Sequence, residues 1–236
     1  MDSKNKKISK ILDKYKSSFS STDLLSLESL LSNDSVVNEN YLLFTDGACE
    51  FDNEYKPINA GIGGVPGFFE VKTEDWQDIW DVNVMGHIHA AKHVLPQMIK
   101  RGSGYLVNTA SAAGLLTQIG SAPYSVTKAG ALSLAEWLKI TYGEKGIGVS
   151  CLCPQAVETP MTAQGAGTAG VDGMISADEC AADVIDAIKK DRFLVTPHKE
   201  VLEYIQRKSS DYDRWISGMQ RLQKKFEDFY NKFNSS

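Results

Sequence analysis

The chain has 236 residues, of which 42% are apolar and 23% are charged, a balance that is ordinary for a globular protein with a core. Its formal net charge of −5 gives no reason to expect nucleic acid or an anionic membrane as a partner. The sequence contains no apolar run near the roughly 20 residues of a membrane span. The four cysteines form no C-x-x-C pair, so we expect four buried thiols in a reducing cytoplasm.

The first part of the chain is rich in Lys, Ser, Asp and Leu. Its apolar spacing predicts two short helices, over 8–15 and 22–31. The basic start has no apolar stretch, so we expect no secretory signal. "YLLFTDG", residues 41–47, predicts a strand that ends in an Asp-Gly turn. We treat residues 1–58 as a divergent N-terminal segment.

From residue 59 onward, helix and strand patterns alternate. Alternation at these lengths predicts βαβ units, and hence an α/β fold with a mostly parallel, doubly wound, Rossmann-like sheet. The predicted helices span 73–100, 123–146 and 177–190, and the predicted strands span 104–111, 148–154 and 192–197. "CLC" on a strand directs both thiols to one side, into a core. We expect a catalytic part over 59–198 and a C-terminal helix or helix pair within 199–236.

One helix carries a pair of residues suited to acid/base chemistry. In "YSVTK", Tyr124 and Lys128 lie four residues apart, so they share a helix face. An ammonium beside a phenol stabilises the phenolate, as a general acid/base near neutral pH requires. Ser111 follows a buried strand, where open α/β sheets place their active sites. Asn83, on the preceding helix, can hold a water or a backbone group.

These pieces resemble the short-chain dehydrogenase/reductase family of the Tyr-x-x-x-Lys type. The resemblance covers roughly residues 59–230 and rests on five motifs in register. They are "NAG" (59–61), Asn83 in "DVNVMG", Ser111 in "NTASAAG", Tyr124 and Lys128 in "YSVTKAG", and "PQAVETPM" (154–161). It implies an NAD(P)-dependent oxidoreductase acting on an alcohol or carbonyl substrate, assembled as a homodimer or homotetramer through the two long helices. The resemblance leaves open the choice between NAD and NADP.

The resemblance also assigns roles to residues. Tyr124 would exchange the proton at the substrate oxygen, Ser111 would orient that oxygen, and Asn83 would sustain a water relay to Lys128. The residues implied in cofactor binding are Asn59, Ala60, Gly61, Tyr124, Lys128, Val157 and Thr159. Gln155 stands where the family usually has glycine, and we expect a slightly altered loop there.

The larger departure lies upstream. A dinucleotide fold needs a strand, a glycine-rich turn and a helix whose N-terminus meets the pyrophosphate. Residues 1–58 contain one glycine, Gly47, and are too short for the three βα units expected before "NAG". "GIGGVPG" (61–67) has Pro66 at the third glycine position. "EFDNEYKP" replaces the apolar strand before "NAG", so we place a seam at residues 57–59.

Three hypotheses follow from these features: an active oxidoreductase, a damaged or fused relative that cannot hold cofactor alone, and a nucleic-acid enzyme. The third rests on "YLLFTDG", which resembles the first strand of ribonuclease H-like domains with Asp46 as a metal ligand, although its later motifs are not visible. His89 and His93 have a zinc-compatible spacing, but no third ligand is evident, so we expect no metal.

Overall fold

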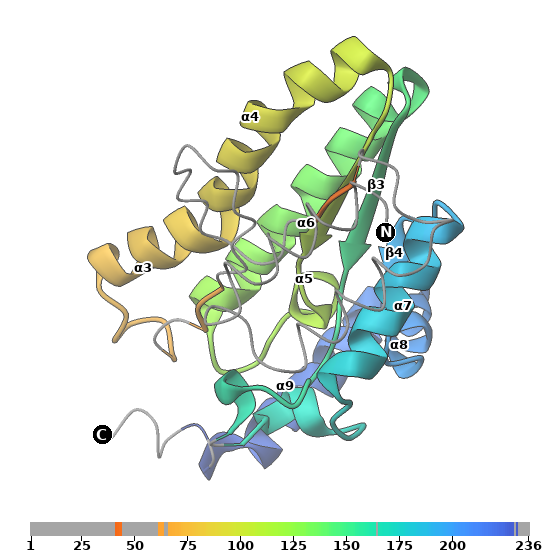
Figure 1. Cartoon of the computed structure of the whole chain (residues 1–236). Helices are drawn as coiled ribbons and strands as arrows, with labels where there is room; N and C mark the ends of the chain where they lie inside the picture. Colours follow the sequence, from red (N-terminus) through yellow and green to blue (C-terminus); the bar gives the residue numbers. More distant parts are fainter. Residues whose placement is uncertain (1–40, 44–60, 64–65, 164, 229, 231–236) are drawn as a thin grey trace.

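The structure, a computed structural model, describes residues 41–43, 61–63, 66–163, 165–228 and 230 (Figure 1). Several sequence predictions lie outside these residues. They are the two N-terminal helices, the Asp-Gly turn with Asp46, the thiol of Cys49, and Asn59 and Ala60 of the "NAG" motif.

The four described strands form one parallel sheet, ordered β1-β2-β3-β4. They are β1 (Tyr41–Leu43), β2 (Gly104–Thr109), β3 (Ile147–Leu152) and β4 (Leu194–Val195). Leu42 pairs with Leu106, and Leu106 pairs with Val149. The predicted parallel sheet is therefore confirmed. Its first described strand comes from 41–43, upstream of the "NAG" motif.

The helices follow the strands along the chain. They are α3 (Thr73–Trp80), the π-helical turn η1 (Asp81–Met85), α4 (Gly86–Arg101), α5 (Ala112–Leu116), α6 (Ala122–Tyr142), α7 (Ala177–Lys189), α8 (Glu200–Ser210) and α9 (Tyr212–Lys225). Three 3-10 turns are η2 (Gly143–Lys145), η3 (Pro160–Thr162) and η4 (Gly167–Gly170). The helices predicted over 73–100, 123–146 and 177–190 and the C-terminal helix pair are confirmed, whereas α5 was not predicted.

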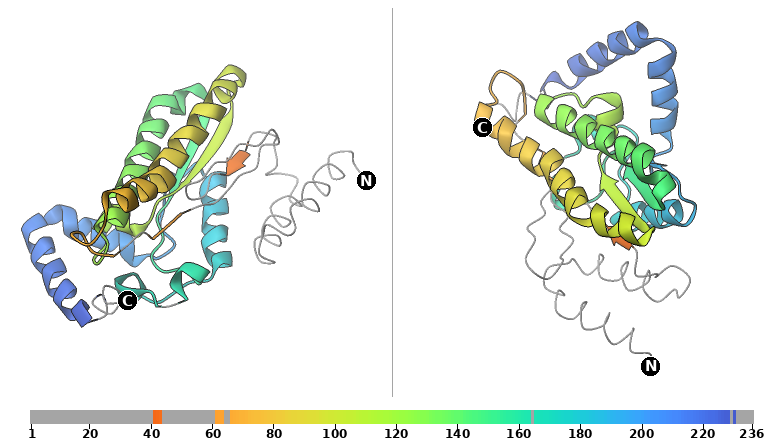
Figure 2. Two further views of the ribbon diagram at one scale, coloured as in Figure 1. Left: turned by 90° about the vertical axis from the view of Figure 1, so that its left-hand side faces the viewer. Right: turned by 90° about the horizontal axis from the view of Figure 1, so that it is seen from above.

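Helices cover both faces of the sheet, in three layers. On one face, α4 and α6 pack on apolar residues of β2 and β3, such as Leu106, Val149 and Cys151 (Figures 1 and 2). On the other face, α7 packs on the strand residues whose side chains point the opposite way, including Val107 and Leu152. Because consecutive strand residues point to opposite faces, the nearly continuous apolar strands supply two cores.

The predicted "CLC" arrangement is confirmed. Cys151 and Cys153 are both buried in the core beneath α6, and their sulfur atoms lie 3.8 Å apart. Cys180 is buried in the second core, on α7. Among the described residues, all three cysteines are free thiols.

The long helix predicted from Thr73 is continuous but not uniform. It runs as α3, widens to the π-helical turn η1, and continues as α4 to Arg101. Gly102 then closes it in the left-handed conformation, with φ of 71°. Single π turns inside α-helices are frequent at functional sites, and this one contains the buried Asn83.

The C-terminal helices form an arm at the carboxyl end of the sheet. Asp211 separates α8 from α9, and its side chain accepts a hydrogen bond from the backbone N–H of Arg214, which caps α9. Figure 2 shows α8 and α9 meeting at a bend, with α9 projecting from the layered body. α8 packs on α5 through the fully buried Val201, whereas α9 has no fully buried residue.

Candidate active site

Ser111 marks the point where β2 ends and a short helix begins. Its hydroxyl accepts a hydrogen bond from the N–H of Ala113 at 3.1 Å and donates to the carbonyl of Pro154 at 3.3 Å. The side chain therefore caps α5 and connects the ends of two neighbouring strands. The predicted position at the carboxyl edge of the sheet is the observed one.

Tyr124 and Lys128 occupy the first two turns of α6. Ser121 is the N-cap and accepts the N–H of Tyr124 at 3.4 Å, and Pro123 follows inside the first turn, where the helix tolerates it. Tyr124 is half-buried, and Lys128 is fully buried. The Lys128 Nζ lies 5.6 Å from the centroid of the Tyr124 ring and donates to the carbonyl of Thr109 at 3.3 Å.

Asn83 connects three separate parts of the site. Its Oδ1 accepts the backbone N–H of Ile62 at 3.1 Å, and its Nδ2 donates to the carbonyl of Ile62 at 3.0 Å. The same Nδ2 lies 3.2 Å from the hydroxyl of Thr127, the residue before Lys128. The π turn thus fixes the segment after "NAG" to α6 beside the Tyr124–Lys128 pair.

Among the other predicted residues, Val157 and Thr159 contact each other, since the hydroxyl of Thr159 donates to the carbonyl of Val157 at 3.4 Å. Val157 and Thr159 are in the loop after β3, where the hydroxyl of Thr162 donates to the carbonyl of Val157 at 2.7 Å. Gly61 adjoins Ile62 on the Asn83 side. The resemblance assigns both Ser111 and Tyr124 to the substrate oxygen. Within the described part of the chain, these two side chains form no hydrogen bond with each other.

A buried polar cluster lies behind Lys128. Nδ1 of His87 and Nδ2 of Asn108 are 3.2 Å apart. Nε2 of His87, Oδ1 of Asn108 and Oγ1 of Thr109 have no hydrogen-bond partner among the described residues. Burial and, secondly, the charge of Lys128 lower the pKa of His87 to about 4, so the ring is neutral at physiological pH.

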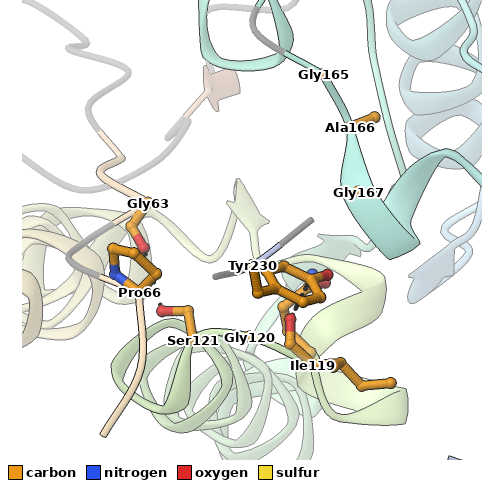
Figure 3. Close-up of a pocket in the computed structure, with 10 residues that line it drawn as sticks. Gly63, Pro66, Ile119, Gly120, Ser121, Gly165, Ala166, Gly167 and Tyr230 are labelled. Atoms are coloured by element: carbon orange, nitrogen blue, oxygen red, sulfur yellow. Dashed lines mark hydrogen bonds between the residues drawn. The ribbon is translucent and has the colours of Figure 1, made fainter. Parts of the chain in front are cut away.

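A small pocket of about 230 Å³ opens beside the start of α6. Figure 3 shows the ring of Tyr230 between Gly120 and the segment around Gly167. The Tyr230 hydroxyl lies 2.9 Å from that of Thr168, which in turn accepts a hydrogen bond from Gln118 Nε2 at 3.1 Å. The C-terminal segment and the loop after Thr159 therefore line one pocket.

A larger cavity of about 690 Å³ lies between the Ser111 end of the sheet and α9. Gln155, the departure from the family pattern, lines it and donates through Nε2 to Asp172 at 2.9 Å. Tyr204 donates to the other oxygen of the Asp172 carboxylate at 2.9 Å. Gln155 thus takes part in a polar bridge that glycine could not form, and the expected change of the loop stays a prediction.

The residues of this site that were not predicted as functional include Thr109, Thr127 and Tyr230. Thr127 could have been found, because it follows Tyr124 by three residues and so shares its side of the helix. No local sequence pattern indicated Tyr230, because its hydrogen-bond partner Thr168 is 62 residues away in the sequence.

The two histidines with zinc-compatible spacing, His89 and His93, are both exposed on α4. Within the described ranges, no group of three metal-ligating side chains converges. The described helices also include none that is long and apolar enough to cross a membrane.

Comparison with known proteins gives one family. Residues 58–168 match the family model described as short chain dehydrogenase. The 1-deoxy-11-beta-hydroxypentalenate dehydrogenase of Streptomyces exfoliatus is 32% identical over 67% of this chain and 60% of its own length. The 3-oxoacyl-[acyl-carrier-protein] reductase of Thermotoga maritima is 35% identical over 44% of this chain and 42% of its own. This chain thus spans about half the length of these relatives.

Solved structures agree on the fold. A short-chain dehydrogenase/reductase from Burkholderia phymatum, in complex with NAD, superimposes with a TM-score of 0.59 and 23% identity, covering 81% of this chain and 73% of its own. An actinorhodin polyketide ketoreductase with NADPH gives a TM-score of 0.55 and 24% identity, covering 75% of this chain and 72% of its own. The described sheet and its helices are therefore Rossmann-like.

Proposed function

Because the chain belongs to the short-chain dehydrogenase family, we propose that it is an NAD(P)-dependent oxidoreductase that interconverts an alcohol and a carbonyl compound. The observation that carries this proposal is the half-buried Tyr124 beside the fully buried Lys128, at the same sheet edge as Ser111. A phenol with a fixed positive charge nearby is suited to proton transfer at a substrate oxygen.

Each side chain has a role in this proposal. Tyr124 donates a proton to the carbonyl oxygen during reduction, or removes the hydroxyl proton during oxidation. The ammonium of Lys128 stabilises the resulting phenolate and is held in place by the carbonyl of Thr109. Ser111 donates a hydrogen bond to the substrate oxygen in exchange for its present bond to Pro154. Asn83 fixes Ile62 and sustains the water relay to Lys128.

The described residues fit the nicotinamide end of a dinucleotide. Lys128 and Tyr124 would hold the ribose, and the loop with Val157 and Thr159 would meet the carboxamide. Three buried polar atoms near Lys128 without described partners, among them Oγ1 of Thr109, give this region unused hydrogen-bonding capacity. When bound, the cofactor supplies or accepts the hydride.

The adenosine end fits less well. Residues 1–58 contain one glycine, Gly47, so no glycine-rich turn of the family type can lie there, and among the described residues the next helix after β1 is α3. This observation favours a second candidate, a family member that cannot hold cofactor by itself. Direct titration with NADH and NADPH, followed by cofactor fluorescence, separates the two candidates. Saturable binding supports the enzyme, and no binding of either at millimolar concentration rejects it.

A variant then tests the assignment of the acid/base. If cofactor binds, Tyr124→Phe should lower turnover by about 10²–10⁴-fold, the usual contribution of general acid/base catalysis. Tyr142→Phe, at the other end of α6, is the matched control and should retain activity. Unchanged turnover in Tyr124→Phe would reject this role for the tyrosine.

We also propose a homodimer or homotetramer formed through α3–α4 and α6, working in the cytoplasm. Trp137 and Ile140 support the interface, since they lie on α6 and are 54% and 82% exposed. Three buried free thiols support a reducing compartment. A monomeric mass by light scattering would reject the oligomer. The division at residues 58 and 198 into an N-terminal segment, a catalytic part and a C-terminal extension remains part of the same proposal.

A further inference from the structure

We infer that the α9 side of the larger cavity is a subsite for an anionic group, a carboxylate or a phosphate, carried by the substrate. The inference rests on the proposed function only in assuming that the occupant of the cavity is a substrate. The cavity of about 690 Å³ is of the size that holds small molecules. It is lined by Ser111 at the sheet and by α9 opposite, so one occupant can contact both.

Cationic side chains lie in a row on the cavity side of α9. Arg214, Arg221 and Lys225 all line the cavity. Their spacings of seven and four residues return to the same helix face. The row extends about 16 Å along the helix, at a rise of 1.5 Å per residue. An anionic group therefore meets positive charge at several depths of the cavity.

The charges of the row are not neutralised within the described part of the chain. No described acidic side chain forms an ion pair with Arg214, Arg221 or Lys225, whereas Arg207, a fourth lining cation, pairs with Glu203 at 3.0 Å. The chain as a whole carries a net charge of −5, so this local excess of positive charge runs against its overall sign. Charge of one sign along a cavity attracts ligands of the other sign.

One acidic residue, Asp172, also lines the cavity. Asp172 already accepts hydrogen bonds at both carboxylate oxygens, from Gln155 and from the Tyr204 hydroxyl. Asp172 forms no ion pair with a lining cation among the described residues, and its single negative charge is outnumbered by four cations in the lining. Hydrogen bonding and burial also keep Tyr204 a neutral donor, because both raise its pKa, burial more than the bond to Asp172.

The remaining wall is apolar. Leu116 on the body and Trp215, Met219 and Leu222 on α9 line the same cavity. These α9 side chains are half-buried, so part of their apolar surface remains available to an occupant. An apolar wall next to a cationic row fits an amphipathic occupant, with a hydrocarbon body and a charged end. Guanidinium groups recognise both carboxylate and phosphate by paired hydrogen bonds.

The test is calorimetric titration of the full chain with three matched probes. They are ω-hydroxydecanoate, its neutral methyl ester, and ω-hydroxydecyl phosphate. We expect the acid to bind at least about tenfold more tightly than the ester, and the preference to shrink as salt is added. A phosphate probe that binds more tightly than the acid would support the subsite and identify phosphate as its group.

Variants locate the effect. Arg214→Gln combined with Arg221→Gln should remove the preference for the acid while leaving ester binding unchanged. Lys224→Gln is the matched control, because Lys224 is exposed on α9 but does not line the cavity. Circular dichroism verifies that both variants keep their helices.

Equal binding of acid and ester would overturn the inference, and so would a preference that survives in the double variant or disappears in the control. The titration needs neither cofactor nor turnover. A preserved preference in a protein without activity therefore rejects the proposed function alone. Turnover without any preference for anionic substrates rejects the subsite alone.

Discussion

Asn83 and Ile62 form a reciprocal pair across 21 residues of sequence. The carboxamide of Asn83 both accepts from the N–H and donates to the carbonyl of Ile62, at 3.1 and 3.0 Å. Asn83 is fully buried whereas Ile62 is exposed, so the pair ties a surface segment to the interior of the fold. A buried side chain thereby satisfies backbone groups of a segment that has no regular secondary structure.

Asn83→Ala should lower the free energy of unfolding by about 2–4 kcal/mol, because it removes two hydrogen bonds to the backbone of Ile62 and one to the hydroxyl of Thr127. Urea denaturation measures the change. Asp81→Ala, in the same π turn but exposed, is the control and should stay within about 0.5 kcal/mol of the parent. Equal stability of Asn83→Ala and the parent would mean that the pair contributes little to folding.

Gly120→Ala should displace the C-terminal segment. A β-carbon at this position would meet the Tyr230 ring at 2.3 Å, and the backbone φ of 90° is one that alanine rarely adopts. We expect a loss of stability from both effects. In a Tyr230→Ala background the steric part should vanish and only the backbone part remain. A double-mutant cycle on unfolding free energies separates them, and strict additivity would contradict the contact.

Tyr230→Phe isolates the hydroxyl. The change removes the hydrogen-bonded contact with Thr168 but keeps the ring, so it should cost about 1 kcal/mol of stability. Tyr212→Phe, an exposed tyrosine at the start of α9, is the control. If the two variants unfold at the same urea concentration as the parent, the hydroxyl contact does not stabilise the fold.

Stability should fall on acidification because of His87. Burial, followed by the charge of Lys128, lowers its pKa from 6.5 to about 4 in the folded protein. Between these values the unfolded chain binds the additional proton, so the stability present above pH 6.5 declines as the pH falls towards 4. The decline from this group amounts to at most about 3 kcal/mol.

Urea denaturation across this pH range tests the assignment. The His87→Gln variant should show a shallower pH dependence than the parent, whatever its absolute stability. His89→Gln changes an exposed histidine of the same helix and should keep the slope of the parent. A slope unaffected by His87→Gln would assign the acid sensitivity to other groups.

The described thiols should resist labelling in the folded state. The contact with Cys153 and burial raise the pKa of the Cys151 thiol well above its ordinary value, and burial raises that of Cys180 to about 11. Few thiolates therefore exist at neutral pH. In a Cys49→Ser variant, a thiol reagent should react only after denaturant is added. Prompt reaction of the native protein would contradict the burial of these cysteines.

The layered α/β body could be predicted from the sequence because the patterns that specify its strands and helices are local and repeated. Apolar runs in 104–109 and 147–152 and the periodic helices between them specify a parallel sheet with covered faces. Tyr124 and Lys128 were found because helical spacing alone places them together. Their catalytic roles, and those of Asn83 and Ser111, stay predictions.

Other features depend on contacts that no local pattern encodes. The strand beside β2 comes from 41–43, although the family resemblance led us to look for it just before "NAG". The bridge from Gln155 to Asp172 and Tyr204 joins three loops and helices that are far apart in sequence. The cationic row of α9 has a helical period, but that it faces a cavity follows only from the bend at Asp211.

The π turn at 81–85 limits which deletions this helix can tolerate. A π turn equals one additional residue in an otherwise regular helix, so it rotates everything after it relative to what comes before. α3 and α4 can therefore pack against different neighbours although they form one continuous helix. Removing one residue of this turn would restore a regular helix, but it would also rotate Asn83 away from Ile62 or the apolar face of α4 away from the sheet. The position of Asn83 and the packing of α4 thus both depend on this π turn.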